Sequence, residues 1–129
     1  MKIILETGCL RSFKEVRIAS LLALEAGADF LKTSTGKTAP AATPEAVFIM
    51  CQAIKEYQSI SNRKVGIKPA GGILTPSDAI VYYAIVKETL GEEWLNNNLF
   101  RIGASKLANN ILTEITAIDN IKTEPIIYF

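Results

Sequence analysis

Two lysines stand where predicted buried strands end, and a glycine-containing turn follows each of them. Lys32 lies in the stretch 30–37, FLKTSTGK, and Lys68 lies in the stretch 65–72, VGIKPAGG. Partial burial disfavours the charged form of a lysine, so a lysine at a strand end is a candidate nucleophile. The alternative is that both are solvated loop residues, but the repeat of one pattern favours chemistry.

The two lysines are expected to lie side by side if their strands are neighbours in a parallel sheet. Adjacent strands are about 4.8 Å apart, and two ammonium groups that close disfavour each other's charge. A lysine pKa of about 10.4 can then fall to roughly 7–8, where the neutral amine attacks an aldehyde to form an imine. For Lys68 the alternative is an ion pair with a carboxylate such as Glu6. Three roles are open for Glu6 itself: to orient Lys32, to take part in proton transfer, or to form a structural hydrogen bond to a neighbouring loop.

Three glycine turns follow successive predicted strands and offer backbone N–H groups to an anion. Such turns and helix N-termini bind phosphate oxygens. One glycine alone is better explained by a tight turn, but three in succession favour an anion site. The predicted phosphate-binding residues are Gly36, Lys37, Gly71, Gly72, Ile73, Gly103 and Ser105.

Four consecutive strand–helix units are predicted to position these turns. The strands are expected at residues 2–6, at the stretch ending in Lys32, at residues 65–68 and at residues 99–102. Helices are expected to begin at the hydroxyl residues Ser12, Thr43 and Thr75, the last two followed by proline, and a final helix runs from residue 104 to about residue 118. The buried face of the second helix is predicted to use Val47, Phe48, Met50, Cys51 and Ile54, and the third helix is continued by Ile80, Tyr83 and Ala84.

Alternating strands and helices predict an α/β fold with a parallel sheet covered by helices. Residues 1–129 are expected to form a single domain, with residues 119–129 as an extended tail. Two architectures fit this pattern: half of a (β/α)8 barrel, or a small open doubly wound sheet. Both place functional sites at the C-terminal ends of the strands.

The composition restricts the function classes. Hydrophobic residues make up 49% and charged residues 21% of the 129 residues, which is typical of a soluble globular protein. A net charge of +1 gives no reason to expect nucleic acid or membrane partners. Without a long apolar run or a signal segment, the chain is expected to be cytoplasmic. Histidine is absent and Cys9 and Cys51 stand alone, so any aldol chemistry is expected to use an amine, without a metal or another cofactor.

Four motifs resemble the deoxyribose-phosphate aldolase family. They are residues 6–8 (ETG), 28–37 (ADFLKTSTGK), 66–72 (GIKPAGG) and 101–105 (RIGAS), and the resemblance extends from residue 2 to about residue 112. It implies that the chain is the C-terminal half of a (β/α)8 TIM barrel. It also implies a class I aldolase, a lyase of deoxyribonucleotide catabolism that cleaves 2-deoxyribose 5-phosphate to acetaldehyde and glyceraldehyde 3-phosphate.

The resemblance also implies residue roles. Lys32 would be the Schiff-base lysine, and Lys68 the neighbour that depresses its pKa and helps to move protons. Many family members carry a basic residue where this chain has Leu74, so phosphate affinity is expected to lean on Lys37 and the backbone. Tyr128 resembles a terminal tyrosine that some members fold toward the active site.

The missing half of the barrel bears on activity and partners, and without it the chain is expected to be an inactive or weak aldolase. The family's proton-relay aspartate would come from strands that precede Met1, and neither Asp29 nor Asp78 lies where it could substitute. Open strand edges and a bare inner face predict a homo-oligomer or a complementary N-terminal half-barrel as partner. The alternative function is a non-catalytic half-barrel module for phosphate binding or assembly.

Overall fold

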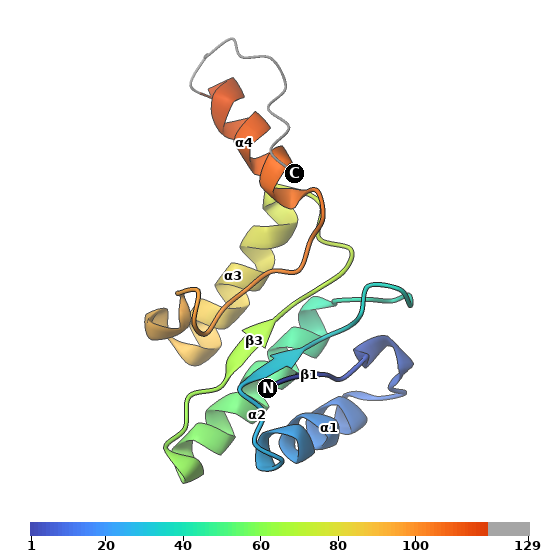
Figure 1. Ribbon diagram of the computed structural model, residues 1–129, viewed down its shortest axis with the longest axis vertical. Coiled ribbons are helices and arrows are strands. Elements are labelled where there is room, and N and C mark those ends of the chain that lie inside the picture. Colours follow the sequence, from blue (N-terminus) through green and yellow to red (C-terminus); the bar gives the residue numbers. More distant parts are fainter. Residues whose placement is uncertain (119–129) are drawn as a thin grey trace.

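A three-stranded parallel sheet with helices between its strands forms the body of the protein (Figure 1). The computed structural model describes residues 1–118, so the predicted tail at residues 119–129, with Tyr128, lies outside the described residues. The strands follow the order β1-β2-β3. The elements are β1 (Lys2–Ile4), the 3-10 turn η1 (Thr7–Cys9), α1 (Phe13–Glu25), β2 (Phe30–Lys32), α2 (Pro44–Ser61), β3 (Gly66–Lys68), α3 (Pro76–Leu90), the 3-10 turn η2 (Glu92–Trp94) and α4 (Leu107–Ile118).

The two faces of the sheet carry different side chains: one face packs against the helices and the other does not. Leu31 and Ile67, partners in register, are completely buried in the core that α1, α2 and α3 share. Their neighbours along the strands point the other way, because successive side chains of a strand alternate between faces. The opposite side therefore carries Lys2, Ile4, Phe30, Lys32 and Lys68.

The helix starts predicted at Ser12, Thr43 and Thr75 are confirmed by their caps, whereas the last helix begins at Leu107 and not at residue 104. The hydroxyls of Ser12 and Thr43 accept backbone N–H groups from the first turns of α1 and α2, each at 3.2 Å. Thr75 and Asp78 form a complete capping box at the start of α3, in which each side chain accepts a hydrogen bond from the backbone N–H of the other. Such caps satisfy N–H groups that have no partner within the helix.

The predicted strand at residues 99–102 is replaced by two isolated parallel bridges to the β3 region, Ile67 with Phe100 and Ala70 with Gly103. The hydrogen bonds show where the ladder breaks. Ile67 uses both its N–H and its C=O toward this segment, at 2.8 and 3.1 Å, and Gly103 donates to the carbonyl of Pro69 at 2.8 Å. Pro69 has no N–H to donate back, so one rung is missing and no continuous strand forms.

One side chain departs from the predicted buried face of the second helix. Phe48, expected in the core, is 42% exposed. Ile80 and Tyr83 lie on α3 as predicted, and both are exposed. The buried aromatic residues of the described chain are Phe30, Tyr82 and Trp94. The Trp94 indole donates to the carbonyl of Val65 at 3.0 Å, so η2 closes the helix-facing core beside β3.

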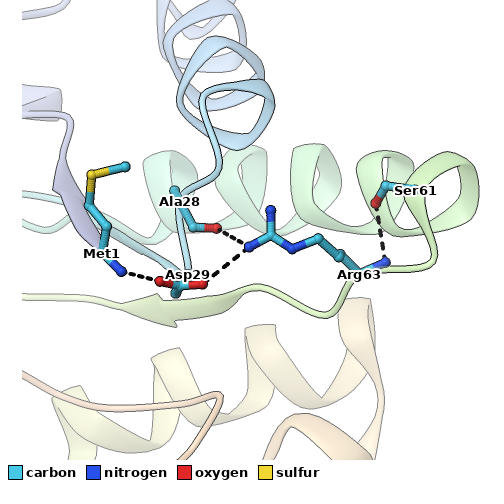
Figure 2. A network of polar contacts seen from close by, with 5 residues as sticks. All are labelled: Met1, Ala28, Asp29, Ser61 and Arg63. Atoms are coloured by element: carbon cyan, nitrogen blue, oxygen red, sulfur yellow. Dashed lines mark hydrogen bonds and ion pairs between the residues drawn. The ribbon is translucent and has the colours of Figure 1, made fainter.

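A polar network ties the strands together at the end of the sheet opposite to the lysines (Figure 2). The Arg63 guanidinium donates to the carbonyl of Ala28 at 3.2 Å and to the Asp29 carboxylate at 3.1 Å, and the amino group of Met1 also contacts Asp29. These contacts hold the pKa of Asp29 below its ordinary value, chiefly through the Met1 ammonium. Within residues 1–118, no helix is both long and apolar enough to cross a bilayer.

Candidate active site

The two predicted nucleophile candidates are neighbours across the sheet. Lys32 ends β2 and Lys68 ends β3, and the two residues are register partners. The sequence-based expectation that these strands pair in parallel is therefore confirmed. Ile4 of β1 occupies the same level on the other side of Lys32, so an apolar residue and two amines line the strand ends.

The surroundings of Lys68 favour its neutral form. Burial lowers the pKa of Lys68 below the ordinary value, and the positive charges of Lys2, Lys32 and Arg101 lower it further. The missing side chain of Gly103 makes room for this amine, because a Cβ there would lie 2.9 Å from the Lys68 Cε. Among residues 1–118 no ion pair joins either strand-end lysine to a carboxylate.

Glu6 bonds to a loop and not to a lysine. Both of its carboxylate oxygens accept the backbone N–H of Thr35, each at 3.2 Å. The proposed ion pair between Glu6 and Lys68 is therefore absent, and the alternative expectation, a bond to a neighbouring loop, is the observed one. Glu6 itself has a left-handed backbone, with φ of 49°, which turns the chain sharply where β1 ends.

Two buried hydroxyls hold the lysine loops in register beyond the end of the sheet. The Thr33 hydroxyl accepts the N–H of Ala70 at 2.9 Å and donates to its carbonyl at 3.2 Å. The Ser34 hydroxyl donates to the same carbonyl at 2.5 Å. Sequence reasoning did not give these residues a role, although two small hydroxyl residues directly after a buried strand are a usable signal for such a bond.

A cavity of about 370 Å³ opens beside Lys32 at the strand ends. Seven of the nine predicted site residues line it, together with Thr35, Ala70, Leu74 and Ala104; the seven are Lys32, Gly36, Gly71, Gly72, Ile73, Gly103 and Ser105. Lys37 and Lys68 are not among the lining residues. The structure therefore brings the three glycine turns to one cavity.

Only some of the backbone N–H groups around this cavity are available to an anion. Gly71 donates to the carbonyl of Gly103 at 3.1 Å, and Gly103 donates to Pro69, so these two groups hold the loops together. Asp78 accepts the N–H groups of Leu74 and Thr75. Within residues 1–118, the N–H groups that line the cavity without a partner belong to Gly36, Gly72, Ile73, Ala104 and Ser105.

A larger cavity of about 500 Å³ lies between η1, the start of α1 and the loop before α2. Its lining includes Arg11, Phe13 and Pro40, and neither strand-end lysine contributes to it. Parallel α/β folds place their chemistry at the C-terminal ends of the strands. The smaller cavity, with its amine and free N–H groups, is therefore the candidate active site.

Comparisons with known proteins point the same way. The chain is 51% identical over 112 residues to a Caenorhabditis elegans protein provisionally named deoxyribose-phosphate aldolase, covering 87% of this chain and 37% of that protein. It is 48% identical over 115 residues to the deoxyribose-phosphate aldolase of Mus musculus, covering 89% of this chain and 36% of the mouse protein. The chain thus spans little more than a third of the length of these relatives.

Solved structures and a family profile extend the likeness to the fold. A crystal structure of a Toxoplasma gondii ME49 protein with the same provisional name superposes with a TM-score of 0.79 at 26% identity, covering 95% of this chain and 47% of that one. The structural neighbours are aldolase barrels, and a three-stranded parallel sheet with its helices is consistent with part of such a barrel. The profile described as DeoC/LacD family aldolase matches residues 1–89. The chain belongs to the DeoC/LacD family of aldolases.

Proposed function

We propose that this chain carries the imine-forming and phosphate-binding part of a deoxyribose-phosphate aldolase. The observation that carries the proposal is the register pairing of Lys32 with Lys68 beside a cavity lined by free N–H groups. The substrate would be 2-deoxy-D-ribose 5-phosphate, cleaved reversibly to acetaldehyde and D-glyceraldehyde 3-phosphate. The names and identities of the relatives support this substrate class.

In the synthetic direction, the neutral amine of Lys32 attacks the carbonyl carbon of acetaldehyde, and loss of water gives an imine. Removal of a proton from the methyl carbon converts the imine to an enamine. The enamine carbon then bonds to the aldehyde carbon of glyceraldehyde 3-phosphate, whose oxygen takes up a proton. Hydrolysis of the new imine releases the sugar phosphate and regenerates the amine.

Lys68 is proposed to move protons in these steps. Its lowered pKa makes the unprotonated amine available closer to neutral pH than for an ordinary lysine. Lys32 and Lys68 end paired strands, so an amine that accepts protons stands next to the amine that forms the imine. The phosphate group of the substrate is proposed to lie against the free N–H groups of Gly36, Gly72 and Ser105, while Lys37 supplies charge from the rim.

The wider assembly is also a proposal. We infer four strand–helix units of a (β/α)8 barrel, the fourth being residues 99–103 with α4, on the strength of their parallel bridges to the β3 region. β1 pairs with β2 alone within the described sheet, which leaves one edge of the sheet open. A complementary half-barrel or a second copy of the chain would cover that edge. The cytoplasmic location expected from the sequence remains a prediction.

Trapping of the imine tests the proposed function. Acetaldehyde and borohydride should reduce an adduct onto Lys32, found by mass mapping of peptides, and Lys32→Arg should abolish it. Lys14→Arg on α1 serves as the matched control and should leave the adduct in place. Labelling spread evenly over surface lysines, or found on Lys68 alone, would contradict the assignment.

The same protein preparation tests the alternative function, a non-catalytic half-barrel module. That function predicts binding of inorganic phosphate without selective trapping at Lys32. Phosphate binding is followed by chemical shift changes of the Gly36, Gly72 and Ser105 amides. An aldolase is expected to show both results.

A further inference from the structure

Two further cations, Lys2 and Arg101, contact the Phe30 ring on the side of the sheet that carries the paired lysines. Lys2 of β1 and Phe30 of β2 are register partners, two residues before Ile4 and Lys32. The Lys2 Nζ lies 5.3 Å from the centroid of the Phe30 ring, and the Arg101 Cζ lies 4.9 Å from the same centroid. Both distances are within the range of a cation–π interaction.

Gly66 is what allows the Phe30 ring to take this position. Gly66 is the register partner of Phe30 on β3, and a Cβ built on it would lie 2.4 to 2.7 Å from three ring atoms. The ring therefore lies across β3, in space that any other residue at position 66 would fill. Because the ring lies across β3, it contacts Arg101 in the segment at residues 99–103 as well as Lys2 on β1. One aromatic ring therefore links these two segments.

Arg101 is also fixed from its other side. Its Nε donates to the carbonyl of Asn97 at 2.8 Å, and its backbone N–H donates to the carbonyl of Ile67 at 3.1 Å. No carboxylate forms an ion pair with Lys2, Lys32, Lys68 or Arg101 within residues 1–118. The charges of Lys2, Lys32 and Arg101 therefore act on Lys68 without an ion pair that offsets them.

Resting on the proposed function of the lysine pair, we propose that Lys2 and Arg101 are positioning residues that make Lys68 the proton acceptor of this site. The Phe30 ring holds both cations near the amine, and their charge raises the free energy of the protonated form of Lys68. Lys32 adds to the same effect from β2. The charged groups that act on Lys68 are thus Lys2 from β1, Lys32 from β2 and Arg101 from the segment after η2.

Direct titration of the Lys68 amine tests the proposal. The chain is prepared with isotope-labelled lysine, and the Lys68 Nζ signal is assigned by its loss in Lys68→Arg. Lys2→Met and Arg101→Met should each shift the pKa of Lys68 upward, and the double variant should shift it furthest. Burial remains in every variant, so the pKa should stay below that of a free lysine.

Conservative variants separate charge from structure. Lys2→Arg and Arg101→Lys keep a cation on the Phe30 ring, so the pKa of Lys68 should remain close to that of the parent chain. Lys14→Met, which removes a lysine remote from the sheet, should also leave it unchanged. An unshifted Lys68 titration in the folded double variant would overturn the proposal.

Salt gives a second readout that does not depend on the stability of the methionine variants. Raising ionic strength from about 0.01 M to about 1 M shortens the screening length from about 30 Å to about 3 Å. The pKa of Lys68 in the parent chain should therefore rise with salt, and a salt-independent value would overturn the proposal. Failure of imine trapping at Lys32 counts against the proposed function instead, because the titration requires no aldehyde.

Discussion

Thr33 and Ala70 are joined by two hydrogen bonds through a single hydroxyl, which accepts the Ala70 N–H at 2.9 Å and donates to the Ala70 carbonyl at 3.2 Å. The side chain thereby takes the place of two backbone hydrogen bonds that would join the two segments if both strands continued. Both residues are buried. The loops that follow Lys32 and Lys68 consequently keep the spacing of the sheet beyond the point where the sheet itself ends.

Removing this hydroxyl should destabilise the protein. Thr33→Val keeps the shape of the side chain but leaves the buried N–H of Ala70 without a partner, which costs about 1–3 kcal/mol of the free energy of unfolding. The Ala70 carbonyl keeps its hydrogen bond from the Ser34 hydroxyl in this variant. Thr33→Ser keeps the hydroxyl and should retain more of the stability. Urea unfolding followed by Trp94 fluorescence measures both, and equal losses in the two variants would count against the bonds.

The contact between Gly66 and Phe30 should show as a coupling between two substitutions. Gly66→Ala places a Cβ against the ring and should lower the free energy of unfolding by about 1–3 kcal/mol. In a Phe30→Leu background the ring is gone, so the same Gly66→Ala change should cost less. A double-mutant cycle from urea unfolding gives the difference, expected at about 0.5–3 kcal/mol. Strict additivity would show that the ring and the alanine do not collide.

Gly71 and Gly72 should respond differently to alanine, although both have positive φ, 87° and 79°. A Cβ on Gly71 would lie 2.6 Å from the Ala41 Cβ, whereas a Cβ on Gly72 meets nothing within 4 Å. Gly72→Ala should therefore cost only the backbone strain of about 1–2 kcal/mol, and Gly71→Ala should cost more. Thermal unfolding of the two variants ranks them, and the reverse order would contradict the described packing.

The capping box of α3 should make stability fall in acid. Hydrogen bonds from the backbone of Thr75 and then of Leu74 lower the pKa of Asp78 below its ordinary value. The unfolded chain therefore takes up this proton first, near the ordinary pKa of about 3.9. The stabilisation is present above that pH and is lost as the pH falls through the folded pKa.

In Asp78→Asn, stability should fall less with decreasing pH than in the parent chain. The measurement is the urea midpoint of unfolding between about pH 6 and about pH 2.5. Glu114→Gln on α4 is the matched control, because Glu114 makes no hydrogen bond within residues 1–118 through its side chain. If the urea midpoint of Asp78→Asn fell with decreasing pH as steeply as that of the parent chain, the pKa of Asp78 would not differ between the folded and unfolded states.

The two cysteines should differ sharply toward alkylating reagents. Burial raises the pKa of the Cys51 thiol to about 12, so almost none of its reactive thiolate is present at neutral pH. Cys9 is exposed on η1. Iodoacetamide should modify Cys9 alone in the folded chain and both cysteines in urea, as read by mass spectrometry. Modification of Cys51 at the rate of Cys9 without denaturant would contradict the buried position.

Sequence reasoning found the lysine pair and the glycine turns because these carry local signals. Hydroxyl residues before proline marked the starts of α2 and α3, and apolar runs ending in lysine marked β2 and β3. It failed where tertiary contacts decide. Phe48 sits at a helical spacing that fits the buried face of α2, but the packing of the helices leaves it exposed.

The interruption of the predicted strand at residues 99–102 could have been recognised from the sequence. Pro69 follows Lys68 directly in the sequence, and its missing N–H breaks the ladder to residues 99–103. The occupied N–H groups of Gly71 and Gly103 were beyond prediction, because which glycine donates to which loop depends on the register between distant segments.

The bond from Gly71 to the carbonyl of Gly103 joins two loops at the cavity without any help from a ligand. Glu6 fixes the Thr35 side of the cavity in the same way, from the end of β1. If the proposed phosphate group binds here, the donors of Gly36 and Ser105 are therefore preorganised. A bulkier anion would then have to break protein hydrogen bonds to enter.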